Sequence, residues 1–165
     1  MSFFRDREKN RNDREAFNPQ NLDLNEIQRL FAAIRKMFIV QSPEQTFSKE
    51  SERTITRFYE LANITKQLTD KQLIQTIDDL EQALSIHVLR MRSALRLRNL
   101  KIIKQAAEAN KMGKREKELF WQILDEIASD YDSLPDEIIH NNRHLFMVDE
   151  ISQSINELLG YFSRE

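Results

Sequence analysis

The chain has 165 residues, of which 40% are hydrophobic and 32% charged, and its formal net charge is −2. That length favours one domain with a sizeable core, and this hydrophobic fraction argues against wholesale disorder. The chain has no cysteine, which excludes disulfides and thiolate metal sites, and no apolar run long enough to span a membrane. We therefore expect an intracellular protein without membrane contact, either cytoplasmic or associated with chromatin or the nucleoid.

Two glycines and three prolines are too few for the frequent turns of a sheet protein. They suit helices, which need few breaking residues. The sequence predicts an all-α fold, a helical bundle with a long central helix and a short helical C-terminal appendix. Residues 1–21 are polar with mixed charge and predict a flexible N-terminal arm, residues 22–134 the helical bundle domain, and residues 135–165 the small appendix.

The first helix is expected to begin near Asp23, because apolar side chains with three–four spacing follow it: Ile27, Leu30, Phe31, Ile34 and Phe38. Residues 42–45 and 69–72 both have the pattern of a capping box, with Ser or Thr three residues before Gln. They predict the starts of a second and a third helix. The third is expected to reach Asn110 and to stop at Gly113.

The third helix is unusual beyond Ile86, because its apolar residues then spread around the axis instead of following one face. A helix with apolar residues on several sides is surrounded by other elements, and in so small a protein another subunit can supply some of them. A fourth helix from about Lys114 is expected to end before Pro135, and Asp149 is expected to cap a last helix.

Charge is segregated along the sequence: basic residues dominate 90–117 and acidic residues dominate 118–150. Such segregation indicates either a partner-binding surface or two helices that neutralise each other across their contact. The residues predicted to contact nucleic acid or a partner are Arg92, Arg96, Lys101, Lys104, Lys114 and Arg115. Aliphatic residues, rather than aromatic residues that stack on bases, alternate with these arginines, which favours a helix interface.

Catalytic patterns are absent from the sequence: there is no nucleophilic serine turn and no glycine-rich phosphate loop. His140 and His144 have the spacing of a helical metal pair, but a site needs a third fixed ligand, and a surface turn explains them more simply. We expect no enzyme, no cofactor and no metal.

The basic part of the third predicted helix, together with the start of the fourth, resembles a known protein family. Residues 87–103 form an Arg/Leu-rich run that contains Leu-Arg-Leu-Arg-Asn-Leu-Lys-Ile (95–102), and Lys-Glu-Leu-Phe (117–120) follows after a short gap. This order, over about residues 60–130, resembles the helical domain of GINS subunits, in particular the archaeal type in which the helical domain comes first. The resemblance implies a non-catalytic DNA-replication factor that scaffolds and activates the MCM helicase. Its implied partners are other GINS-type subunits, MCM and a RecJ/Cdc-type protein.

Under this resemblance, the third helix lies in a contact of a homo- or hetero-oligomer. The expected interface residues are Val88, Met91, Leu95, Leu97, Leu100 and Ile103. One feature departs from the family pattern: GINS subunits usually carry a small β-rich domain after the helical one, whereas the residues after Pro135 read mainly as helix, with 143–148 as the one candidate strand.

Two alternatives stay open. The chain can be a helical protein that binds nucleic acid directly through residues 90–117, in which case the basic side chains must be exposed together and binding must weaken with salt. It can also be a self-assembling structural protein, a homo-oligomer that captures only further copies of itself from cell extract.

Overall fold

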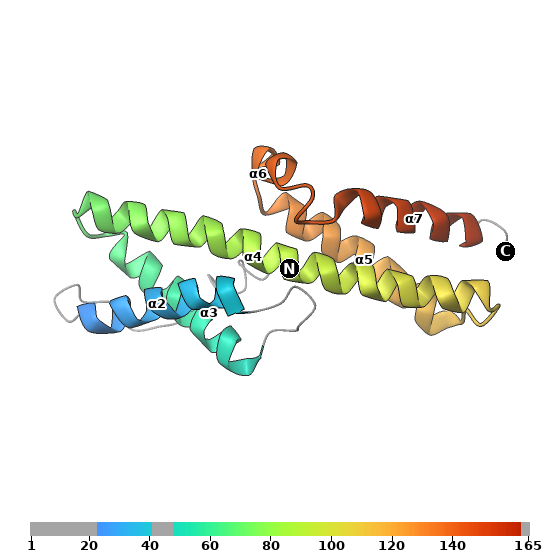
Figure 1. The fold of residues 1–165 in the computed structure, drawn as a ribbon, viewed down its shortest axis with the longest axis horizontal. Coiled ribbons are helices and arrows are strands. Elements are labelled where there is room, and N and C mark those ends of the chain that lie inside the picture. Colours follow the sequence, from blue (N-terminus) through green and yellow to red (C-terminus); the bar gives the residue numbers. More distant parts are fainter. Residues whose placement is uncertain (1–22, 41–47, 163–165) are drawn as a thin grey trace. The chain divides into compact units, whose positions relative to one another are not determined.

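The computed structural model describes residues 23–40 and 48–162 (Figure 1). Every regular element in these ranges is a helix, which confirms the all-α prediction. The helices are α2 (Leu24–Val40), α3 (Lys49–Thr65), α4 (Lys71–Glu108), α5 (Lys114–Asp132), α6 (Asp136–Asn141) and α7 (Val148–Phe162). No helix in the described ranges is both long and apolar enough to cross a membrane. The predicted arm, residues 1–21, lies outside the described residues.

Short polar side chains begin the first three of these helices. The carboxylate of Asp23 accepts hydrogen bonds from the backbone N–H of Asn25 (2.9 Å) and Glu26 (3.3 Å), so α2 starts where the sequence predicted. The hydroxyl of Ser48 accepts from the N–H of Ser51 at 3.1 Å and caps α3. The capping box predicted at 42–45 lies outside the described residues.

The predicted cap of the long helix is wrong by one residue. Asp70, not Thr69, accepts from the backbone N–H of Gln72 (2.9 Å) and Leu73 (3.3 Å). A carboxylate is favoured here because it satisfies unpaired N–H groups and also complements the positive end of the helix dipole.

The end of α4 also differs from the prediction. Asn110 has a φ of 54°, and the N–H of Lys111 donates to the carbonyl of Ala106 at 2.8 Å while that of Asn110 donates to Ala107 at 3.2 Å. This pair of bonds is the Schellman motif. Asn110 therefore ends α4, whereas Gly113 (φ −104°) precedes α5 and donates its N–H to Oε2 of Glu116 at 2.9 Å.

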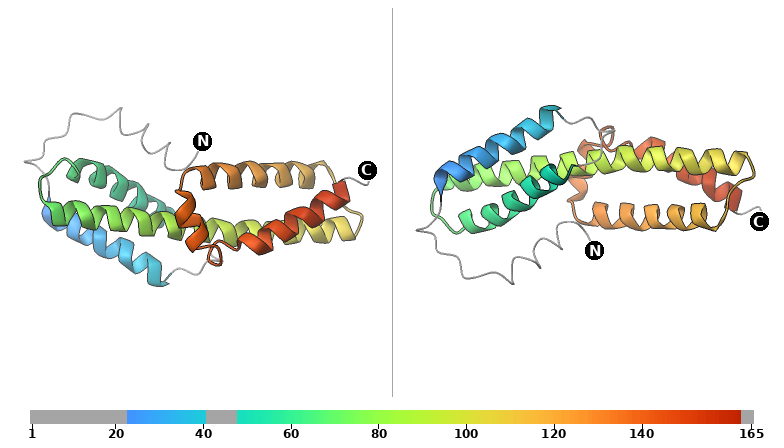
Figure 2. Two further views of the ribbon diagram at one scale, coloured as in Figure 1. Left: turned by 90° about the horizontal axis from the view of Figure 1, so that it is seen from above. Right: turned by 90° about the horizontal axis from the view of Figure 1, so that it is seen from below.

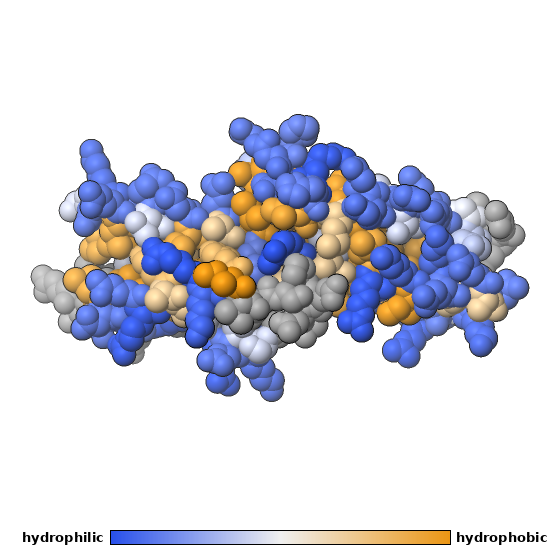
Figure 3. All heavy atoms as spheres, viewed as in Figure 1, coloured by the Kyte–Doolittle hydropathy of each residue, from blue (hydrophilic) through white to orange (hydrophobic). Residues whose placement is uncertain are grey.

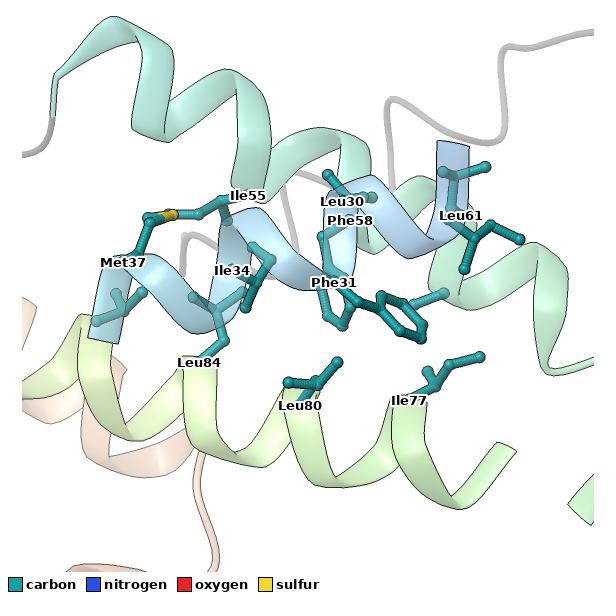
Figure 4. Close-up of a cluster of buried hydrophobic side chains, with 13 residues drawn as sticks. Leu30, Phe31, Ile34, Met37, Ile55, Phe58, Leu61, Ile77, Leu80 and Leu84 are labelled. Carbon is teal, nitrogen blue, oxygen red and sulfur yellow. The ribbon is translucent and has the colours of Figure 1, made fainter. Parts of the chain in front are cut away.

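Contacts divide the chain into two compact units, one up to Val88 and one from Leu89 onward. In the first unit, α2 and α3 pack on the first half of α4 (Figure 4). Phe31 and Phe58 meet edge to face with their ring centroids 5.9 Å apart. Of the side chains predicted for the first helix, Phe38 is only partly buried and packs against the core, and the other four lie in it. The buried core is Ile27, Leu30, Phe31, Ile34, Met37, Ile55, Phe58, Leu61, Ala62, Ile77, Leu80, Leu84 and Val88.

In the second unit, α5 runs back along the second half of α4, and α7 runs beside both (Figures 1 and 2). Their common core is Leu100, Ile103, Ala107, Phe120, Ile123, Ile151 and Leu158. The C-terminal residues therefore share a core with α4 and α5, whereas the expected division set 135–165 apart from 22–134. Residues 143–147 form turns and Val148 begins α7, so the candidate strand at 143–148 is wrong.

The two cores explain the apolar residues on several sides of α4. Val88 belongs to the first core, while Leu100 and Ile103 belong to the second. Elements of the same chain therefore bury part of the stretch for which the sequence suggested a second subunit, while Ile102 remains 52% exposed.

Candidate interaction surface

A buried ion cluster joins α4 to α5 inside the second unit. Asp130 accepts from Nη1 of Arg92 at 2.8 Å and from Nη2 of Arg96 at 2.5 Å, and Arg96 and Asp130 are 5% and 6% exposed. The more exposed Glu126 lies 3.7 Å from Nε of Arg96. Burial raises the pKa of the neighbouring Tyr131 hydroxyl, and the positive charge of Arg96 opposes that rise. This cluster has the geometry of a structural link, because the buried charges of Arg96 and Asp130 compensate each other for their lost hydration.

The six residues predicted to contact nucleic acid do not form one exposed basic surface. Arg92 and Arg96 are committed to Asp130, and Lys104 is paired with Glu157 of α7. Lys101, Lys114 and Arg115 are exposed, and Lys114 lies 3.8 Å from Glu118. For Arg92 and Arg96, the structure therefore favours neutralisation between two helices over a phosphate-binding surface.

The predicted subunit-interface residues lie largely inside the chain. Val88, Met91, Leu100 and Ile103 are at most 3% exposed, and Leu95 and Leu97 are half-buried. Side chains buried in the chain's own core are not available to a second subunit in this conformation. An interface on this helix must use other residues.

The two predicted metal-pair histidines do not share a helix. His140 is in the last turn of α6, which ends at Asn141, and His144 follows in a turn; both are exposed. No group of three or more metal-ligating side chains occurs among the described residues.

Among the described residues of the second unit, Trp121 of α5 and Leu159 of α7 are exposed large hydrophobic side chains, as is Ile102 of α4. Trp121 is 53% exposed and stacks on Phe162 with centroids 6.2 Å apart and planes 22° apart, while Leu159 is 39% exposed. We call this surface the α5–α7 seam. It consists of two helical stripes with three–four spacing that the Trp121–Phe162 contact brings together: Trp121, Leu124 and Ala128 of α5, and Ile155, Leu159 and Phe162 of α7.

The position of Trp121 follows from the spacing of α5. Phe120 and Trp121 are adjacent, so their side chains point about 100° apart around the helix and cannot both enter one core. Phe120 is fully buried, and it contacts both Trp121 and Phe162 edge to face at 5.3 and 4.7 Å. The sequence prediction assigned Phe120 inward correctly and did not single out Trp121, although two adjacent aromatic residues on a helix are the signal that would have found it.

Polar side chains dominate the face of the molecule that Figure 3 shows. Hydrophilic residues form most of its outline, and hydrophobic ones show in narrower strips between them. In a chain with about a third of its residues charged, a half-exposed tryptophan that stacks on a phenylalanine is a distinct feature.

Comparison with known proteins gave no relative. The chain matches no model of a protein family, and neither curated proteins nor solved structures contained a significant match.

Proposed function

We propose that this chain is a non-catalytic subunit of a multi-protein assembly and that it receives a helical segment of a further subunit on the α5–α7 seam. The observation that carries the proposal is the exposure of Trp121 on its stacking partner Phe162. Tryptophan is among the residues most enriched at the energetic centres of interfaces, because it buries a large area with few rotatable bonds. Two rows of apolar side chains on neighbouring helices suit an amphipathic helix.

The assembly that we propose is of the GINS type, with the chain acting as a DNA-replication factor that scaffolds and activates the MCM helicase. Support for this reading is the order of the basic run at 95–102 and Lys-Glu-Leu-Phe at 117–120. These segments lie in the second half of α4 and the first turns of α5, and Phe120 anchors their common core. The described residues after Pro135 are helical, so the family's β-rich domain has no counterpart among residues 136–162.

The test uses Trp121 as its own reporter, because it is the one tryptophan of the chain. The purified MCM helicase of the same organism is titrated into the full chain, and the emission of Trp121 is followed. Docking on the seam is expected to shift the emission to shorter wavelength, because the indole loses water. Trp121→Ala is expected to abolish co-purification with MCM, whereas Gln122→Ala, on the exposed side of the same helix, is expected to retain it.

Unchanged emission together with undiminished capture of MCM by Trp121→Ala would refute docking on the seam. Absence of MCM binding, with binding of nucleic acid that weakens steeply with salt, would favour the nucleic-acid alternative. That alternative has the weaker support, since Arg92, Arg96 and Lys104 are paired within the chain.

A further inference from the structure

The second half of α4 has an outward face that no helix of its own unit covers. Leu100, Ile103 and Ala107 belong to the core, and Ile102, about 200° around the helix from Leu100, is 52% exposed. Leu95 precedes Ile102 by seven residues, which is close to two turns, and it is half-buried. These two side chains therefore form a short apolar strip on the outside of α4.

Two basic residues lie along one border of this strip. Arg98 and Lys101 are about 40° and 100° around the helix from Ile102, in the same direction. Both are exposed, and neither has an ion-pair partner among the described residues. We call Leu95, Arg98, Lys101 and Ile102 the α4 outer face; its positive charges are not neutralised nearby.

The α5–α7 seam has the opposite charge on its α5 border. Asp125 and Asp132 lie about 40° and 20° around the helix from Trp121, in the same direction. Both carboxylates are exposed, and within the described residues neither has an ion-pair partner. By contrast Glu118, one turn before Trp121, already lies 3.8 Å from Lys114.

Asp132 has a further reason to attract a cation. It is the last residue of α5, and the last turn of that helix contains no basic residue. A carboxylate at a helix C-terminus is unfavourable, because it adds to the negative end of the helix dipole. A positive side chain from another molecule would relieve this repulsion.

The opposite borders of the two surfaces carry less charge: beside the seam, Lys117 lies about 40° from Trp121 on the side away from Asp125, and it is half-buried. On α7, the exposed Asn156 precedes Leu159 by one turn and carries no charge. On α4, Asn99 and Ala106 lie on the side of Ile102 away from Arg98, and they are uncharged as well. The seam is thus an apolar strip with two exposed carboxylates along one border, beyond the Lys114–Glu118 pair, and the α4 outer face is an apolar strip with two exposed basic side chains along one border.

We infer that the α5–α7 seam of one copy binds the α4 outer face of a second copy. This inference rests on the proposed function: the seam that docks a helical segment of MCM in that proposal is occupied, in the absence of MCM, by a second copy of the chain. The apolar strip of the outer face would cover Trp121 and Leu159, and its basic border would meet Asp125 and Asp132. Complementary charge favours this pairing. A contact between two outer faces, or between two seams, would bring like charges together.

The contact is head to tail, since it joins two different surfaces of the chain. Each added copy therefore leaves one seam and one outer face free, and the assembly grows into a ring or an open chain. The exposed apolar residues are few, and stable interfaces bury about 1,200–2,000 Å². We expect association that is weak, rises with protein concentration and weakens with salt, because its ion pairs lie at the surface.

Two charge-reversed variants of the full chain test the inference. The first, Arg98→Glu with Lys101→Glu, has an acidic outer face and an acidic seam. The second, Asp125→Lys with Asp132→Lys, has two basic surfaces. Each alone is expected to sediment as a monomer at concentrations where the wild type associates. An equimolar mixture of the two is expected to associate again, because the acidic outer face of the first variant can then bind the basic seam of the second.

Circular dichroism of each variant establishes that it is folded, and the emission of Trp121 shows whether association covers the seam. A wild-type chain that stays monomeric at every concentration would overturn the inference, and so would a mixture that fails to associate. If the chain is monomeric but MCM still shifts the emission of Trp121, the inference fails and the proposed function stands. If neither MCM nor a second copy changes the emission, both fail.

Discussion

Arg96 of α4 donates through Nη2 to Oδ2 of Asp130 of α5 at 2.5 Å, and both side chains are more than nine-tenths buried. Nη1 of Arg96 is also buried, and it has no hydrogen-bond partner among the described residues. The guanidinium therefore depends on Asp130 to compensate for the loss of its hydration. This makes the pair a sensitive point of the second unit.

Removal of one partner of this pair is expected to be costly. Asp130→Asn leaves Arg96 charged and uncompensated inside the second unit, and should lower the free energy of unfolding by about 3–5 kcal/mol. Glu126→Gln is the control, because Glu126 lies 3.7 Å from Arg96 and is 46% exposed, and should cost less than about 1 kcal/mol. Urea denaturation measures both; equal effects would show that Asp130 has no special role.

The ending of α4 gives a second prediction. Asn110 holds a φ of 54°, which glycine adopts freely and alanine does not. Asn110→Ala should destabilise the chain by about 1 kcal/mol, and Asn110→Gly should be close to neutral. Gly113→Ala is a useful contrast, since its φ is ordinary and an added Cβ would meet only the flexible end of Glu116, at 3.2 Å. If thermal denaturation shows Gly113→Ala to be the more damaging change, the assignment of the helix stop is wrong.

Each core can be tested through its central aromatic residue. Phe58 and Phe120 are fully buried in the first and the second core, and replacement of either by alanine should cost about 3–5 kcal/mol. Hydrogen exchange followed by mass spectrometry should show faster exchange in α2 and α3 for Phe58→Ala, and in α5 and α7 for Phe120→Ala. The reverse pattern would contradict the division at Val88 and Leu89.

The pairing of Lys104 with Glu157 predicts a dependence on pH. The hydrogen bond from Lys104, assisted by that from Gln153, lowers the pKa of Glu157 below its ordinary value. A carboxylate whose pKa is lower in the folded state stabilises the fold above its unfolded pKa, about 4.3, and loses that effect as the pH falls through the folded pKa. Glu157→Gln should thus be less stable than the wild type at neutral pH, and the difference should disappear at an acid pH below the folded pKa of Glu157.

Urea denaturation at the two pH values, in low and high salt, measures this dependence. Because the pair is exposed to solvent, salt should reduce the difference near neutral pH. A difference that persists undiminished at acid pH would show that Glu157 acts through packing and not through its charge.

The sequence by itself determined the helical class, because a chain with two glycines and three prolines cannot supply the turns of a sheet, and because apolar spacing of three and four residues marks helices directly. It also identified the inward residues of the amphipathic helices, such as Ile34 and Phe120, and the start of α2 at Asp23. These properties are local: they depend on neighbours within one or two turns.

The tertiary structure alone decided which side chains remain available to a partner. Leu100 and Leu95 are both apolar residues of one helix, but only contact with α5 and α7 determines that Leu100 is buried. Likewise, Arg96 and Arg98 are equivalent in sequence, and Asp130, 34 residues after Arg96, neutralises one and not the other. Burial and charge pairing depend on residues distant in sequence. For this reason only the tertiary structure shows that Trp121, Leu159 and Ile102 are exposed, while the core residues of α4 are not available to a partner.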